Sequence, residues 1–245
     1  MSADLIDPII QFLGIVGTII GGYEALKRGF TFASTKIMKR HQTRVWPVRS
    51  KDKLLIVCPL QPDVTQQSLP TTHHDALAAM EVMLAATKRG VDAKILLASQ
   101  LTDQDIRQNM FLICGPVGNA MTAKFLDRIR LPFTFKKSGG NGYVIVDGGE
   151  HVAHPTADSK RDFALIAKTT NPWGPPGTWI FLAAGIHGLG TTGSASYLVT
   201  RFNQIAQQLR ANGMRERDNF AAVLECSGDE FGFPLNTKVV AIAPV

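Results

Sequence analysis

The chain contains few cysteines, and they lie far apart. Cys58, Cys114 and Cys226 are the three cysteines among 245 residues, and no Cys-x-x-Cys pair occurs. An odd, sparse set excludes a disulfide framework, and the missing close pair gives no support to a structural zinc site. The cysteine content therefore favours a reducing compartment, and the sequence indicates neither a metal site nor a particular cofactor.

Acidic residues are missing between Glu24 and Asp52. Basic residues occupy the same stretch: Lys27, Arg28, Lys36, Lys39, Arg40, Arg44, Arg49 and Lys51. Because acids and bases nearly balance elsewhere, the net charge of +6 arises locally and does not indicate general nucleic-acid binding. Aromatic residues are also sparse in this stretch, so base stacking has little support. We expect the basic block to contact an anionic membrane surface.

A hydrophobic run of full membrane-spanning length is missing as well. The uncharged run from Pro8 to Tyr23 is slightly shorter than the roughly 20 residues that span a bilayer core. Asp4 and Asp7 stand where a secretory signal would carry basic residues. The basic block after the run matches the positive-inside pattern, which places the rest of the chain on the cytoplasmic face of a membrane.

Glycines give this run a second property. Gly14, Gly17 and Gly21 fall on one face of a helix, and a face without side chains lets another backbone approach closely. We therefore predict that residues 1–26 form a hydrophobic helix. It either anchors the chain in a membrane or mediates self-association in a homo-oligomer or larger assembly. The alternative is a buried N-terminal helix of a soluble cytoplasmic protein.

Residues 53–245 are expected to form one α/β domain, connected to the hydrophobic helix by a basic linker over 27–52. The apolar share of 45% is sufficient for a packed core. Strands are predicted over 53–60, 93–98 and 110–114, and helices over 75–89 and 120–129, the first capped by Asp75. This alternation predicts a three-layer, Rossmann-like fold with a mainly parallel sheet.

A different pattern interrupts the alternation between Phe133 and Val146. Two short apolar stretches flank the sequence Ser-Gly-Gly-Asn-Gly, which predicts a β-hairpin insertion. Beyond it, strands are predicted over 163–168, 179–184, 220–224 and 238–242, and one long helix over 194–211.

Two glycine-containing loops, 115–119 and 185–193, each follow an apolar strand and precede a helix. In open parallel sheets, ligands bind beyond the carboxyl ends of the strands, where helix N–H groups favour an anion such as phosphate. We expect both loops at one sheet edge, forming a pocket for a small nucleotide-like ligand. The candidate binding residues are Gly115, Gly118, Asn119, Asp162, Gly185, Gly188, Gly190, Thr191 and Thr192, with Asp162 binding a ribose hydroxyl. Alternatively, the glycines only form tight turns.

A histidine and a cysteine follow two of the predicted strands. The strand over 179–184 leads to His187, and the strand over 220–224 leads to Cys226, with one helix between them. An imidazole near a thiol lowers the thiol pKa and activates it. The arrangement resembles that of caspase-like cysteine peptidases, whose histidine and cysteine follow neighbouring strands. The resemblance implies a His187–Cys226 catalytic dyad; the alternative is a buried structural cysteine and a loop histidine.

Three functions stay open at this point. The chain is a ligand-binding α/β domain that uses the glycine loops, a cysteine hydrolase that uses His187 and Cys226, or a non-catalytic subunit that anchors an assembly. The two glycine loops in one domain favour the first. Whether the protein is an enzyme is not determined by its sequence.

Overall fold

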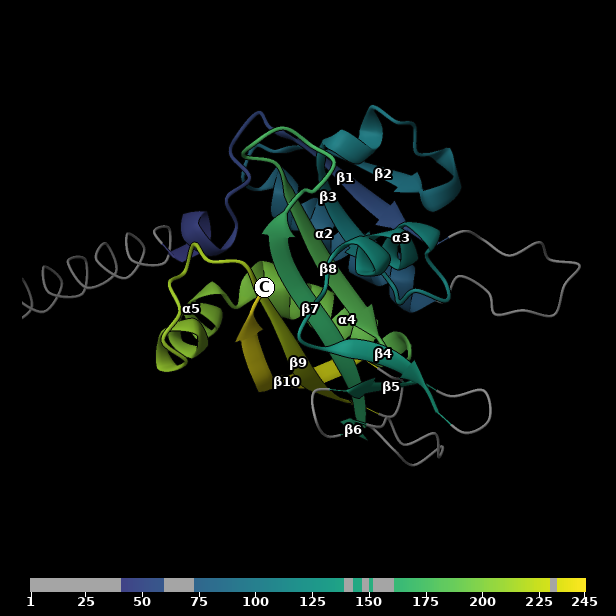
Figure 1. Ribbon diagram of the computed structural model, residues 1–245, viewed down its shortest axis with the longest axis vertical. Helices are drawn as coiled ribbons and strands as arrows, with labels where there is room; N and C mark the ends of the chain where they lie inside the picture. The colour runs from purple at the N-terminus through teal and green to yellow at the C-terminus, as the bar shows by residue number, and fades with distance from the viewer. Residues whose placement is uncertain (1–40, 60–72, 139–142, 147–149, 152–160, 230–232) are drawn as a thin grey trace, which may run out of the picture.

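The computed structural model describes residues 41–59, 73–138, 143–146, 150–151, 161–229 and 233–245 (Figure 1). The hydrophobic helix predicted over residues 1–26, and the part of the predicted linker before residue 41, lie outside the described residues. Within the described ranges, no helix has both the length and the hydropathy needed to cross a membrane.

A seven-stranded sheet with the order β10-β9-β7-β8-β3-β1-β2 forms the centre of the fold (Figure 1). Its strands are β1 (Lys53–Cys58), β2 (Asp92–Leu97), β3 (Asn109–Ile113), β7 (Arg161–Thr170), β8 (Trp179–Gly185), β9 (Phe220–Gly228) and β10 (Pro234–Pro244). β2, β1, β3 and β8 pair in parallel, with Ile56 opposite Phe111 and Phe111 opposite Phe181. Three of these strands, β1, β3 and β8, are buried on both faces of the sheet. Their sequences are therefore nearly continuous apolar runs.

β7 runs against its two neighbours. It pairs antiparallel with β8 on one side and with β9 on the other, and β10 pairs antiparallel with β9. Five of the seven strands therefore point one way, which confirms a mixed α/β fold with a mainly parallel sheet. The orientation of β7 was not predicted, because a buried parallel strand and a buried antiparallel strand have the same apolar pattern.

The predicted hairpin is present and belongs to a second sheet. β4 (Thr134–Lys137) pairs antiparallel with β5 (Tyr143–Val146), with Phe135 opposite Ile145, and β5 pairs with β6 (Glu150–His151). Ile145 is fully buried against the central sheet. The insertion therefore covers part of one sheet face.

Helices and the small sheet enclose the central sheet in three layers. One face carries α2 (His73–Thr87), α4 (Gly188–Thr200) and α5 (Phe202–Ala211), and the other carries α3 (Ala120–Arg128) with the small sheet (Figure 1). Each face has its own apolar core. Residues alternate between the two cores along each strand, so that Ile56 faces α2 while Val57 faces the α3 side.

The helix predicted over 194–211 is in fact two helices. Arg201 leaves the helical conformation, with φ −101° and ψ 39°, and separates α4 from α5. α4 also begins earlier than predicted, at Gly188, so most of the loop predicted over 185–193 is helical. The first predicted helix also begins earlier than expected. α2 begins at His73, which places Asp75 within its first turn rather than at the N-cap.

Part of the predicted basic linker is packed into the domain. Residues 41–45 are helical, and Trp46 is 1% exposed, stacked on Phe111 and Phe181 with ring centroids 5.7 and 4.6 Å away. Val45 and Val48 are buried beside it. The domain therefore begins before Lys53, contrary to the predicted boundary, because a single tryptophan in a charged stretch gives no periodic signal.

Candidate functional site

The two glycine loops lie side by side at the carboxyl edge of the parallel strands. β3 and β8 are neighbours in the sheet, and Cys114 N–H donates to Ala183 O just where the strands end. A Cβ placed on Gly115 would lie 3.6 Å from Gly185 O. The expected juxtaposition of the loops is therefore present.

Asn119 organises the first loop. Its side-chain amide donates to Val57 O and Ile113 O at the ends of β1 and β3, and its Oδ1 accepts from the first N–H groups of α3, those of Met121 and Thr122. The residue is completely buried. Its hydrogen-bonding capacity is used within the fold, so Asn119 shapes the loop and has no free group for the ligand contact that was predicted.

Gly188, Gly190 and Gly193 form the pattern Gly-x-Gly-x-x-Gly at the start of α4, a match that the prediction for the loop over 185–193 missed. Such a pattern between a strand and a helix is typical of dinucleotide-binding folds, where the last glycine allows close helix–strand packing. A Cβ on Gly193 would lie 2.8 Å from the Cys226 sulfur of β9, which is this kind of packing. A side chain on Gly188 would overlap the ring of His74.

A carboxylate of the protein itself occupies the N-terminus of α4. Asp162 Oδ2 accepts from Gly190 N–H at 2.6 Å and from His187 N–H at 3.1 Å, and Oδ1 accepts from Phe163 N–H at 2.8 Å. Asp162 is 3% exposed. Helix N-termini stabilise anions, and here the anion is intramolecular. Asp162 therefore holds the position where a phosphate was expected, instead of extending to a ribose.

Other donors at this edge stay free. Among the described residues, the N–H groups of Val117, Gly118, Gly188 and Leu189 have no hydrogen-bond partner. They come from both loops. A ligand that bridges the loops would find backbone donors on each side.

His187 is the residue of this edge that is best placed to act on a ligand. It stands between β8 and α4, and its Nδ1 lies 3.6 Å from Asp162 Oδ1 while 56% of its side chain is exposed. The hydrogen bond and charge of Asp162 raise the pKa of His187, although burial acts in the opposite direction. Since Nδ1 faces the carboxylate, Nε2 is left without a partner in the described structure.

Thr191 and Thr192 are used inside the fold. Thr191 Oγ1 accepts from Gly185 N–H at 3.1 Å, and Thr192 Oγ1 donates to backbone oxygens of His74 and Gly188. Both side chains are buried. They hold α4 against β8 and α2 and leave no hydroxyl for the predicted ligand contacts.

The predicted His187–Cys226 dyad does not have the geometry that its resemblance implied. β7 lies between β8 and β9, so the two residues do not follow neighbouring strands. Cys226 is 0% exposed, and burial raises the pKa of its thiol to about 12. Its polar contacts within the described residues are with Gly190 O and Thr237 Oγ1, not with His187.

Cys114 directly precedes the loop over 115–119 and was not considered as a site residue. It follows β3 with a φ of +79°, a strained conformation for a residue with a side chain. Burial raises the pKa of its thiol to about 12, and the nearby Asp75 acts in the same direction. The thiol is therefore protonated at neutral pH and is not an activated nucleophile.

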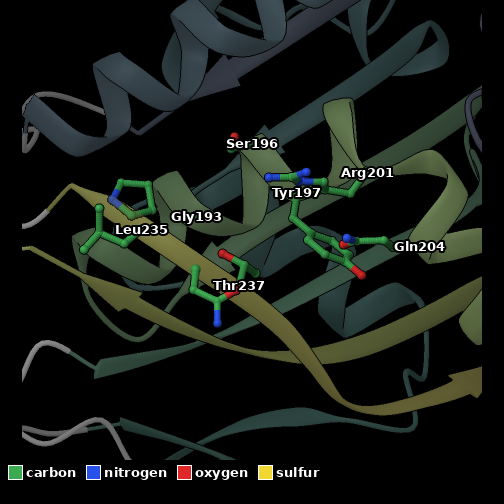
Figure 2. Close-up of a pocket in the computed structure, with 9 residues that line it drawn as sticks. Gly193, Ser196, Tyr197, Arg201, Gln204, Leu235 and Thr237 are labelled. Carbon is green, nitrogen blue, oxygen red and sulfur yellow. The ribbon is translucent and has the colours of Figure 1, made fainter.

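A separate hollow lies between α4 and β10 (Figure 2). It encloses about 140 Å³ and is lined by Gly193, Ser196, Tyr197, Arg201, Gln204, Pro234, Leu235, Asn236 and Thr237. None of the predicted ligand-binding residues lines it. The hollow therefore offers control positions for experiments on the glycine loops.

No group of three or more metal-ligating side chains is assembled within the described ranges. The sequence matches no protein-family model and shows no significant similarity to a curated protein. The candidate site is therefore defined by its own geometry: two adjoining glycine loops, backbone donors that have no partner among the described residues, and a histidine held by a buried carboxylate.

Proposed function

We propose that this chain binds a small anionic, nucleotide-like ligand at the carboxyl edge of its central sheet. The observation that carries the proposal is the contact between the two loops, where Gly115 lies against Gly185. Ligands of open α/β sheets bind at such an edge. The Gly-x-Gly-x-x-Gly pattern at the start of α4 supports the same ligand class.

The anionic group binds beside the N-terminus of α4 rather than on its axis, because Asp162 fills that position. The unpartnered N–H groups of Gly118 and Gly188 lie on the two sides of the edge, and the imidazole of His187 supplies positive charge when protonated. These groups replace the side-chain contacts that were predicted for Asn119, Thr191 and Thr192.

Thermal unfolding with AMP, ADP and inorganic pyrophosphate tests the proposal. A ligand at 100 times its Kd stabilises the folded state by about 2.7 kcal/mol. Gly115→Leu should keep the fold, since its Cβ has ordinary contacts, but the longer side chain should block the gap between the loops. Arg201→Gln, which removes a charge at the hollow, is the control and should still respond.

Two results would contradict this proposal. One is the absence of stabilisation by all three probes. The other is an equal response of the wild-type chain and Gly115→Leu, which would place the ligand elsewhere.

We also propose, from the sequence, that residues 1–26 attach the chain to the cytoplasmic face of a membrane or to further copies. Flotation of the full chain with liposomes should then depend on anionic lipid and weaken with salt, because the basic block binds head groups electrostatically. Equal flotation with neutral liposomes at high salt would contradict a role for this block.

A further inference from the structure

We propose that His74 and His187 form an acid–base pair that hydrolyses a phosphoester bond of the bound ligand. This inference rests on the proposed function, because it needs a phosphate-bearing ligand at the carboxyl edge. It adds an activity, and it assigns a role to His74, which was not among the predicted site residues.

The two imidazoles come to one edge from different elements. His187 follows β8, and His74 is the second residue of α2. The ring of His74 lies against Gly188, where a glycine is required because a Cβ would overlap the ring. Packing of α2 on α4 therefore places His74 beside the residue that follows His187.

Each ring is held through its Nδ1 atom. His187 Nδ1 lies 3.6 Å from Asp162 Oδ1, and His74 Nδ1 lies 3.3 Å from Thr192 Oγ1. The Nε2 atom of each ring has no partner among the described residues. A histidine whose one nitrogen is fixed presents the other nitrogen to a substrate in a defined direction, as acid–base catalysis requires.

The surroundings move the two histidines toward opposite protonation states. Asp162 from β7 raises the pKa of His187. Burial and the neighbouring His73 of α2 lower the pKa of His74, and Asp162 opposes them weakly. Among the described residues, Asp162 and His73 are the two titratable side chains that shift the pKa values of the pair. Near neutral pH, His74 is then the base and His187 the acid, which matches the general rule that diverging pKa values identify the two roles.

The reaction needs only water in addition to the ligand. His74 Nε2 accepts a proton from a water molecule while the water oxygen forms a bond to phosphorus. The bond between phosphorus and the ester oxygen breaks, and that oxygen receives a proton from His187 Nε2. Exchange of one proton with solvent at each ring restores the starting state, and nothing is oxidised or reduced.

Two phosphodiesters that differ in their leaving group test this assignment on the full chain. Bis(p-nitrophenyl) phosphate releases a weakly basic phenolate, whereas diphenyl phosphate releases a more basic one that needs an acid. His74→Gln should lower kcat/KM for both diesters by about 10²-fold or more. His187→Gln should lower it by a similar factor for diphenyl phosphate and much less for bis(p-nitrophenyl) phosphate.

Arg201→Gln, at the separate hollow, is the control and should retain the wild-type rate at the pH optimum. His73→Gln removes the ring that stacks on His74 at 4.0 Å and lowers the pKa of His74, so it should move the acid limb of the pH profile to higher pH. The wild-type rate should follow a bell-shaped pH profile, with the acid limb lost in His74→Gln.

Binding and turnover separate the two proposals. Stabilisation by ADP without cleavage of either diester would overturn the acid–base pair and leave the proposed function standing. Absence of both stabilisation and cleavage would overturn both. Cleavage that survives His74→Gln and His187→Gln equally would show that another protein or site is responsible, and would also overturn the pair.

Discussion

The absence of a side chain at Gly190 leaves room for the carboxylate of Asp162. A Cβ at this position would lie 2.7 Å from both Asp162 Oδ2 and Phe163 O, closer than such atoms can approach. We predict that Gly190→Ala lowers the free energy of unfolding by about 1–3 kcal/mol through overpacking. Urea unfolding measures this loss.

Gly115→Ala is the control for that change, because its Cβ would have only an ordinary contact with Gly185 O. Its unfolding midpoint should stay close to that of the wild type. Equal stability of both variants would contradict the steric role of Gly190.

The pairing of Asp162 with His187 makes stability depend on pH. The pKa of His187 is raised in the folded state, so the pair contributes stability that is fully present below the unfolded pKa of about 6.5 and is lost as pH rises through the folded pKa. We predict that Asp162→Asn removes this dependence and lowers stability by about 1.5–3 kcal/mol, through weaker bonds to the N–H groups of His187 and Gly190.

An NMR titration of the His187 ring checks the cause directly. The pKa of His187 should fall in Asp162→Asn and stay unchanged in Arg201→Gln, which alters a charge at the separate hollow. An unchanged His187 pKa in Asp162→Asn would show that another group raises it.

The positions of the candidate site residues were predictable from the sequence only in part, for a physical reason. Glycines before a helix are visible in a sequence, and Gly115 and Gly185 do adjoin. Asp162 and Gly190, which are hydrogen-bonded, are 28 positions apart in the sequence. His74 and Thr192, which are in contact, are 118 positions apart. No local pattern encodes such contacts, so the roles of Asp162 and His74 required the structure.

Among the elements, β7 carries an unexpected charge. Lys168 is 0% exposed, and its Nζ donates to Glu216 O at 3.0 Å and to Arg44 O at 3.4 Å. Burial lowers its pKa to about 8, although Asp218 and Glu216 act to raise it. A buried ammonium group with these partners ties β7 to the loop before β9 and to the helical turn at residues 41–45.

From the lowered pKa of Lys168 we predict that the free energy of unfolding rises toward alkaline pH. Because the folded pKa of about 8 lies below the ordinary lysine pKa of 10.5, the unfolded chain binds more protons in that interval. The free energy of unfolding should therefore increase between these pH values, by an amount on the order of 1–3 kcal/mol. Lys168→Met should flatten the increase, as measured by urea unfolding at several pH values. A slope that persists in Lys168→Met would assign it to another group.

Most elements were predictable from local patterns, and their arrangement was predictable only in part. Gly90 and Gly213, with φ of +70° and +73°, end α2 and α5 as their sequences indicate. The break at Arg201 was missed because apolar residues continue with helical spacing on both sides of it. The insertion of β7 between β8 and β9 depends on pairing across the chain, which spacing along the sequence does not reveal.

At the scale of the molecule, the packing of Trp46 defines how much of the N-terminus the domain needs. Deleting residues 1–30 should leave a folded and more soluble domain. Deleting residues 1–48 removes Val45, Trp46 and Val48 from the core and should destabilise it severely, since loss of a buried tryptophan costs about 3–5 kcal/mol.

Circular dichroism melting and size-exclusion chromatography of the two truncated chains measure the difference. Unfolding of the chain that lacks only residues 1–30 would show that the hydrophobic segment belongs to the core. Retained folding of the shorter chain would show that the stack of Trp46 on Phe181 is dispensable.

The pairing of β3 with β8 has a consequence for synthesis on the ribosome. β3 ends at Ile113, and β8, which covers its free edge, begins at Trp179. A nascent chain that has completed β3 therefore displays an unpaired apolar strand until β8 emerges, and such edges pair readily with other chains. The candidate site is completed at the same moment, when Gly185 reaches Gly115. Release of the chain from the ribosome before β8 should thus yield a product that aggregates and lacks the candidate site, whereas release after β10 should yield a paired β3 and a complete candidate site.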